Sequence, residues 1–412
     1  MKAFIASAGS FFLLNLMFGL SSFGQEDTQA KAKKIHQEVY TVDSHNDTPM
    51  SFGDADFNMA ERHNVKNGGS RMDFPRMKEG GLDGAFFAVF TGQGPLTDDG
   101  RQSAYLRAKT TFDNIYKTAA KHADLAGIAL TPKDGYRLNK EGKTSMFIGL
   151  ENGYPIGLDI NRIQEFYNLG TRYITLCHTK NNDICDSSTD KAGSLHNGLS
   201  DFGKLVVAEM NRLGIMVDVS HMSDKSFYDV IATSKVPVIA SHSCAKALCD
   251  NPRNMSDEML LTLAQNGGVI QMCVFSAYVK SPDPNPARDS AESALRQKYR
   301  DWSKLSPEEQ KVARSAYRAV RQKYPEKLAT VSDLVDHIDH IVKIAGIDHV
   351  GIGTDFDGGG GLADCMDASQ MENITLELVK RGYAKKNIAK IWSGNLFGVM
   401  NEVEIYASKQ KK

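Results

Sequence analysis

The stretch from Ile215 to His242 constrains the fold more strongly than any other part of this 412-residue chain. It contains two apolar runs, Ile215–Ser220 and Pro237–Ser241. A histidine follows each run directly, His221 after the first and His242 after the second, and a helix-period pattern lies between the runs. This order is typical of a strand, a helix and a parallel strand, whose carboxyl ends meet at one edge of a sheet. We therefore expect the two imidazoles to lie side by side, where they could hold a metal ion.

Apolar runs of the same kind recur along the chain, with helix-period patterns between them. One such pattern places Phe202, Val206 and Met210 on one face of a helix. Strands that alternate with helices favour a parallel sheet, and eight strands are the number that a closed parallel barrel requires. The sequence therefore predicts an α/β fold, a (β/α)8 TIM-type barrel. The eight runs cover residues 40–44, 84–90, 146–150, 173–177, 215–220, 237–241, 269–275 and 349–354.

One segment, residues 280–330, interrupts this alternation. It opens with three prolines and continues as a stretch rich in Lys, Arg and Glu, without a strand pattern. We predict a helical insertion before the last strand, on the rim where the active-site loops of a barrel lie. Two roles stay open for it: it covers or narrows the site, or it only pads the barrel surface. The barrel domain as a whole is predicted to span residues 35–405.

The first 24 residues have the features of a secretory signal peptide. Lys2 precedes an apolar segment, and small residues follow it up to Gly24. A retained membrane helix is the alternative, but the apolar core is short and Asn15 interrupts it. We expect residues 1–24 to be removed and the mature protein to be exported, either periplasmic or secreted, without a stable membrane anchor.

Composition narrows the classes of partner. The formal net charge of −1 argues against nucleic acid and against a polybasic membrane contact, so a small-molecule substrate fits better. The hydrophobic content of 41% allows a large core. The six cysteines are an even number, which permits disulfides in an exported chain, but no pairing can be assigned.

Potential metal ligands follow several of the apolar runs. His45 and Asp47 stand two apart after the first run, where alternate residues share a face. Alone this pair is more often a hydrogen-bonded turn. With Glu151 after the third run, and with His221 and His242, it completes a set of nitrogen and oxygen ligands that suits zinc or another divalent ion.

A bridging Glu151 would give each of two ions three protein ligands. His45 and Asp47 would complete the first set, and His221 and His242 the second. Two such ions would hold a shared water, lower its pKa and polarise a neighbouring carbonyl group, which favours hydrolysis. The sequence therefore predicts a pair of divalent ions per subunit, zinc or another transition metal.

Three further residues that follow apolar runs can each be interpreted in two ways, as part of the reaction or as ordinary structural residues. Asp355 is expected to carry a proton between the water and the leaving group, or else to cap the glycine-rich turn around it. His178 is expected to donate to the oxyanion, or else to be an ordinary core histidine. Arg253 could hold a substrate carboxylate, although a single loop arginine is usually just solvated.

Together these residues resemble the membrane dipeptidase family, also called renal dipeptidases, of the metal-dependent amidohydrolases. The resemblance runs from about Val42 to Val399 and implies a (β/α)8 barrel with two zinc ions that hydrolyses dipeptides, often with a D-residue on the carboxyl-terminal side. It matches His178 to the histidine at the scissile carbonyl, Arg253 to the carboxylate anchor and Asp355 to the proton carrier. It matches the ligands to His45, Asp47, Glu151, His221 and His242. The motifs that carry it are residues 43–47, 71–81, 149–153, 175–178, 217–223, 241–243, 252–254 and 353–358.

The chain also departs from that family. Mammalian members have a lipid-anchor signal and a disulfide-linked dimer, which the polar tail 401–412 and these cysteine positions do not reproduce, so a homodimer stays open. Shorter members lack the segment 280–330. Phe275 stands where such members place a tyrosine toward the substrate, so side-chain preference is expected to differ.

Three functions follow, in decreasing order of support. The first is an exported zinc-dependent dipeptidase with a dipeptide, including an L-D dipeptide, as its substrate. The second is another binuclear-metal amidohydrolase, such as a β-lactam or cyclic-amide hydrolase or a deaminase. The third is a non-catalytic binding protein on the same barrel, which would be expected to have lost a ligand, whereas none is missing.

Overall fold

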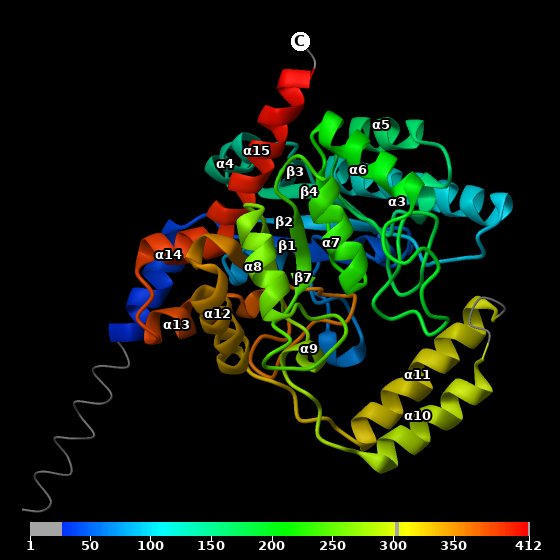
Figure 1. Cartoon of the computed structure of the whole chain (residues 1–412). Helices are drawn as coiled ribbons and strands as arrows, with labels where there is room; N and C mark the ends of the chain where they lie inside the picture. Colours follow the sequence, from blue (N-terminus) through cyan, green and yellow to red (C-terminus); the bar gives the residue numbers. More distant parts are fainter. Residues whose placement is uncertain (1–26, 301–304, 411–412) are drawn as a thin grey trace, which may run out of the picture.

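The computed structural model describes residues 27–300 and 305–410 of the chain (Figure 1). The predicted signal peptide, residues 1–24, lies outside the described residues. A helix over residues 27–38 leads into the first strand. Within the described ranges, every helix is too short or too polar to cross a membrane.

Eight parallel strands, one in each predicted run, follow one another around the sheet in chain order. The last strand returns to the first through a parallel bridge between Asn46 and Phe356, beside which Asp355 N donates to His45 O at 2.9 Å. The predicted TIM-type barrel is therefore confirmed. The strands are β1 (Val42–Asn46), β2 (Gly84–Phe90), β4 (Thr144–Glu151), β5 (Thr171–Thr175), β6 (Met216–Asp218), β7 (Ile239–Ser243), β8 (Val269–Cys273) and β9 (Val350–Gly353).

The short strand β3 (Ala126–Ile128) was not predicted. It pairs with the start of β4, from Thr144 to Met146, and β5 takes over the same edge of β4 from Ile148 onward. Three residues are too few to show the alternation that identifies a strand in a sequence, so β3 could only be found from its partner.

Helices between the strands bury apolar faces against the barrel, and several of them begin at a residue whose side chain caps the first turn. In α6, for example, Ser200 accepts a hydrogen bond from Gly203 N at the first turn, and Gly214 ends the helix with a φ of 90°, where glycine is favoured. The helices that surround the barrel are α2 (Phe74–Glu79), α3 (Asp98–Lys121), α4 (Pro132–Lys140), α5 (Asn161–Asn168), α6 (Asp201–Leu213), α7 (Asp224–Thr233), α8 (Asp257–Gln265), α9 (Ser276–Val279), α12 (Val331–Ala345), α13 (Glu372–Lys380), α14 (Lys385–Ala389) and α15 (Asn395–Gln410).

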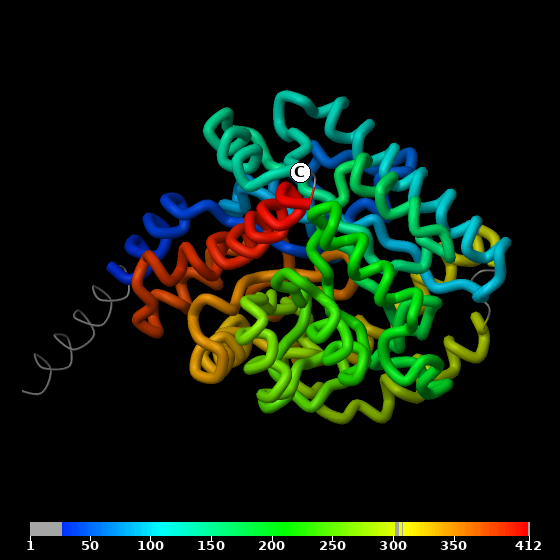
Figure 2. Tube along the Cα trace, turned by 45° about the horizontal axis from the view of Figure 1, so that its top comes forward, coloured from blue at the N-terminus to red at the C-terminus, as the bar shows by residue number. Residues whose placement is uncertain are grey.

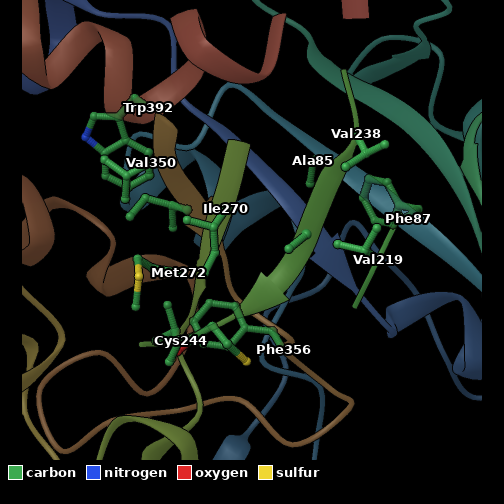
Figure 3. Close-up of a cluster of buried hydrophobic side chains, with 14 of the residues drawn as sticks. Ala85, Phe87, Val219, Val238, Cys244, Ile270, Met272, Val350, Phe356 and Trp392 are labelled. Atoms are coloured by element: carbon green, nitrogen blue, oxygen red, sulfur yellow. The ribbon is translucent and has the colours of Figure 1, made fainter. Parts of the chain in front are cut away.

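The core has an outer and an inner part. The outer part lies between strands and helices and includes Phe87, Ile270 and Trp392 (Figure 3). The inner part joins the first residues of several strands to α15, which runs across that end of the molecule (Figure 2). Since α15 closes the amino-terminal end of the barrel, the carboxyl ends of the strands remain for a site. All six cysteines are buried and unpaired.

Residues 280–330 include two helices that pack side by side and project from the barrel (Figure 1). We call α10 (Pro286–Lys298) and α11 (Pro307–Lys323) the arm. At its base, Arg288 pairs with Glu326 at 2.6 Å, and Ser276 Oγ accepts from Ala329 N at 2.9 Å. The arm therefore leaves the barrel and returns to it at neighbouring points.

Candidate metal centre

Glu151, the last residue of β4, lies at the centre of the predicted site and is 2% exposed. Its Oε1 lies 3.2 Å from His221 Nε2, 3.7 Å from His242 Nε2 and 3.7 Å from His178 Nε2. Its Oε2 lies 3.5 Å from His45 Nε2. The barrel therefore brings together histidines from four different strand ends around one carboxylate.

The clustered side chains fall into three overlapping groups whose candidate ligand atoms lie within 4.8 Å of one another. The groups share Glu151 or His45, so more than one ion could be held without any change in the fold. All five predicted ligands take part, and His178 and Asp355 lie beside them. The groups are His45, Glu151 and His242; Glu151, His178 and His221; and His45, Asp47 and Asp355.

His45 is held from behind by β5. Tyr173 places its hydroxyl 2.7 Å from His45 Nδ1, and both side chains are fully buried. A Cβ at Gly149 would fall 2.1 Å from the Tyr173 ring, so only glycine leaves space for this tyrosine. The contact directs the other ring nitrogen, Nε2, toward Glu151 and toward Asp47, whose Oδ2 is 3.6 Å away.

His221 occupies a strained backbone position just after β6. Its φ is 71°, a conformation that residues other than glycine rarely adopt. The conformation is fixed by Ser188 N, which donates to His221 O at 2.8 Å. As a result, His221 Nε2 lies 2.8 Å from Nε2 of His242 on β7.

Asp355 directs its carboxylate toward the site, while its backbone organises the glycine-rich turn. The carbonyl oxygen of Asp355 accepts from Gly358, Gly359 and Gly360 at 3.1, 3.0 and 2.7 Å. A Cβ at Gly358 would lie 2.0 Å from Asp47 Oδ2 and 2.3 Å from Asp355 Oδ1. Asp355 thus caps the turn through its main-chain carbonyl, while its carboxylate lines the cavity.

A cavity of about 430 Å³ opens above these residues. Arg253 lines it and is only 5% exposed, with Nη2 donating to His242 O at 3.1 Å. The wall also carries Phe90, whose ring packs on His178 with centroids 4.8 Å apart. Among the described residues of 280–330, none lines this cavity, so the arm does not narrow it.

Phe275, which stands in place of the tyrosine expected from the resemblance, lines the cavity. A tyrosine of this chain lies close to it. Tyr278 lines the same wall, packs against Phe275 at 4.6 Å between ring centroids and faces the guanidinium of Arg253 at 5.4 Å. The sequence analysis missed Tyr278. It stands three positions after Phe275, about one helical turn, and this spacing could have indicated that both rings face the cavity.

Burial keeps two of the imidazoles, His221 and His242, neutral. It lowers the pKa of His221 and of His242 well below the ordinary histidine value, so both rings are neutral at pH 7, the form that binds metal. Burial, followed by the charge of Asp47, raises the pKa of Asp355 well above the ordinary carboxyl value. Burial alone would also raise the pKa of Glu151, but His45 and His178 outweigh it and hold the pKa well below the ordinary value.

The residues present fit a divalent metal. Three buried atoms of the candidate ligands have no hydrogen-bond partner within the described chain, namely His45 Nε2, Asp47 Oδ1 and His221 Nδ1. Leaving such atoms buried and unpaired is costly, and a cation bound between imidazoles and carboxylates removes the cost at the two atoms that face the cluster, His45 Nε2 and Asp47 Oδ1. The donors are nitrogen and oxygen without sulfur, the set expected for a catalytic zinc site.

Two buried carboxylates that support the site were not predicted. Asp43 accepts from Thr354 N and Thr354 Oγ1, both at 2.7 Å, and ties β1 to the segment that carries Asp355. Burial raises the pKa of Asp43 to about 6. Asp218 ends β6 and is also fully buried. A charged residue inside an apolar run was the signal for both, since such a residue must find partners in the interior.

Comparisons with known proteins agree with this geometry. Residues 29–412 match the family model "Membrane dipeptidase (Peptidase family M19)". The chain is similar to dipeptidase tcpJ of Claviceps purpurea, with 30% identity over 90% of this chain and 78% of that protein. It is also similar to the structure of the probable dipeptidase PvdM from Pseudomonas aeruginosa, with 31% identity, a TM-score of 0.80 and coverage of 93% of this chain and 100% of that one.

A more distant structure shares the fold. A metallopeptidase from Rhodobacter sphaeroides, liganded with a phosphinate mimic of the dipeptide L-Ala-D-Ala, has 21% identity and a TM-score of 0.68 over 89% of this chain and 99% of that one. The family match covers nearly all of the described residues, and the candidate ligands lie within it. The chain therefore belongs to the membrane dipeptidase family, peptidase family M19, and is a metallopeptidase.

Proposed function

We propose that this protein is a zinc-dependent dipeptidase that hydrolyses free dipeptides, including those with a D-residue at the carboxyl end. One observation carries the proposal: the buried carboxylate of Glu151 lies within 3.7 Å of nitrogens from His45, His178, His221 and His242, below a cavity that also holds a buried arginine. Such a cluster has little use in a purely structural barrel.

We assign two Zn²⁺ to the five predicted ligands. His45, Asp47 and Glu151 would hold one ion, and Glu151, His221 and His242 the other. Zinc bound there supplies a Lewis acid and a water of lowered pKa. The chain's own groups must then bind the substrate, orient it and move protons.

Arg253 is suited to hold the free carboxylate of a dipeptide. The guanidinium is buried, and its Nε has no hydrogen-bond partner among the described residues. A planar guanidinium matches a carboxylate with paired hydrogen bonds, and the match is strong where water is excluded. An anchor that lines the same cavity as Glu151 would select substrates whose carboxylate lies one residue beyond the scissile bond.

His178 and Asp355 are suited to stabilise the negative charge that develops during hydrolysis and to transfer a proton. Burial lowers the pKa of His178, so the ring is neutral and offers one N–H to the substrate carbonyl oxygen as negative charge develops on it. Asp355 lies on the other side of the cluster and lines the cavity, where its carboxyl can accept a proton and pass it to the leaving amine.

The test is hydrolysis of a dipeptide library by metal-reconstituted protein. The library contains L-L and L-D dipeptides, their carboxyl-amidated forms, and a panel of lactams, cyclic amides and nucleobases. We expect turnover of free dipeptides, little turnover of amidated ones, and loss of activity after chelation that zinc restores. Turnover restricted to lactams, cyclic amides or nucleobases would contradict the proposed substrate class.

We also propose export, on the basis of the signal-peptide pattern in residues 1–24. Amino-terminal sequencing of the protein recovered from fractionated cells tests this directly. We expect a mature chain that begins near Gln25 in the periplasmic or secreted fraction. An intact Met1 in the cytoplasmic fraction would contradict it.

A further inference from the structure

A chain of buried hydrogen bonds leads from β5 and β6 to the imidazole of His242. At its centre, the fully buried Asp218 accepts four hydrogen bonds. Backbone N–H groups of Ser220 and Ser241 donate to Oδ1 at 3.0 and 2.8 Å. The hydroxyls of Thr175 and Ser241 donate to Oδ2 at 2.5 and 2.6 Å. Every acceptor position of this carboxylate is therefore in use.

The direction of these bonds fixes a proton on His242. The hydroxyl of Ser241 has one proton, which it gives to Asp218. Toward His242 Nδ1, 2.8 Å away, Ser241 Oγ can then only accept, so Nδ1 must carry the imidazole proton. The other nitrogen, Nε2, presents its lone pair to Glu151 and His221, which lie 3.7 and 2.8 Å away.

We propose that Asp218 and Ser241 are positioning residues that hold His242 as the Nδ1–H tautomer, which leaves Nε2 free to bind a divalent cation. The proposal rests on the proposed function in one respect, because it takes His242 as a metal ligand. Partners in this outer position typically change metal affinity by about 10- to 100-fold. The strand β5 provides none of the five assigned ligands, yet it supports two of them, His242 through Thr175 and Asp218, and His45 through Tyr173.

The substitution Asp218→Asn reverses the chain of donors without changing its shape. The two backbone N–H groups can only donate, so they select the amide oxygen of the new side chain. The amide nitrogen must then face the hydroxyls of Thr175 and Ser241 and donate to both. Ser241, now an acceptor there, turns its proton toward His242 Nδ1. The imidazole proton moves to Nε2, where it blocks the metal.

Two measurements test the proposal, and neither depends on catalytic activity. The first is ¹⁵N NMR of histidine-labelled, metal-free protein, in which the His242 signal is assigned by its loss in His242→Gln. The second is competition for Zn²⁺ between the protein and a chromophoric chelator. We expect the Nδ1–H signature in the unmodified protein, the Nε2–H signature in Asp218→Asn, and about 10- to 100-fold weaker binding of one zinc ion in that variant.

Ser241→Ala is the second variant, because it removes a single hydroxyl. It leaves Nδ1 without its partner, so we expect a mixture of tautomers and weaker binding of the same ion. The matched control is Ser145→Ala. Ser145 is equally buried, lies at the start of β4 and donates to Gly135 O at 3.2 Å, whereas Ser241 accepts from an imidazole, so removal of the Ser145 hydroxyl should leave both readouts unchanged.

An Nε2–H signature in the unmodified protein would overturn the proposal, whether or not the variants fold. Zinc binding by Ser241→Ala equal to that of Ser145→Ala would also overturn it. The result is separable from the proposed function. Hydrolysis of dipeptides by a protein with the proton on Nε2 would refute only the tautomer assignment. Conversely, the predicted NMR and zinc results without dipeptide turnover would refute only the substrate assignment.

Discussion

The metal centre and the arm hold charged residues in opposite ways. In the metal centre, Glu151 and His45 are buried at strand ends, and polar atoms such as His45 Nε2 have no hydrogen-bond partner in the described chain. In the arm, Arg288 pairs with Glu292 at 3.1 Å, and at the base of the arm it pairs with Glu326 at 2.6 Å; all three side chains are partly exposed. The buried polar atoms of the first region need a cation as their partner, whereas the paired side chains of the second already have partners within the chain.

The energetic consequence differs accordingly. Surface ion pairs contribute about 0–1 kcal/mol each, so single changes in the arm should matter little. A buried carboxylate or imidazole that loses its partner costs several times more, because water cannot replace the partner. Substitutions in the metal centre should therefore reduce metal content and activity much more than substitutions in the arm.

Glu151→Gln should give the largest effect. Glu151 is shared by two of the three ligand groups, and an amide is a much weaker metal ligand than a carboxylate. We expect loss of bound zinc and a fall in kcat well beyond the roughly 100-fold change typical of an outer partner. Metal content after dialysis and steady-state kinetics measure this. Glu292→Gln in the arm is the matched control, and full zinc content in Glu151→Gln would remove Glu151 from the ligand set.

Asp355→Asn should separate catalysis from metal binding. Asparagine keeps the size of the side chain but cannot carry the proton, so we expect kcat to fall by about 10²- to 10⁴-fold, with zinc content unchanged. The exposed Asp348, which pairs with Lys390 on the surface, gives the control Asp348→Asn. Equal kcat in Asp355→Asn and the unmodified protein would exclude Asp355 from proton transfer.

Arg253→Ala should act on substrate recognition. A hydrogen bond between charged groups contributes about 1.5–3 kcal/mol, so we expect kcat/KM for free dipeptides to fall by about 10- to 100-fold. Carboxyl-amidated dipeptides, which the unmodified protein uses poorly, should be almost unaffected. Arg288→Ala removes an arginine of the arm and serves as the control. If both kinds of dipeptide lost activity equally in Arg253→Ala, the anchor assignment would fail.

Much of the barrel could be predicted from sequence, because apolar runs and helix patterns are local signals. The candidate ligands followed from the same signals, since the carboxyl ends of parallel strands must meet. The roles of Asp218 and Tyr173 could not be predicted in this way. Their contacts with Ser241 and His45 join residues 23 and 128 positions apart, and which inward-facing side chains touch depends on the stagger of the strands.

Backbone strain and short elements were also beyond the sequence. The positive φ of His221 follows from its contacts with the segment around Ser188, and a histidine gives no local sign of such a conformation. Strand β3 is too short for a pattern. The role of the arm stayed open because a charged amphipathic helix has the same composition whether it covers a site or projects into solvent.

Deletion of the arm should give the smallest effect on catalysis. Its described residues do not line the cavity, and its base is held by contacts outside the deleted part, including Lys280 Nζ with Asp333 Oδ1 at 2.8 Å. Replacing residues 283–326 with a short Gly-Ser linker should therefore keep the zinc content and change kcat/KM by no more than about twofold, the range of ordinary surface changes. A tenfold fall in kcat/KM with zinc retained would place the arm in the path of the substrate. In that case the arm would cover the site during turnover, and the contrast between the two regions would hold only for the structure without substrate.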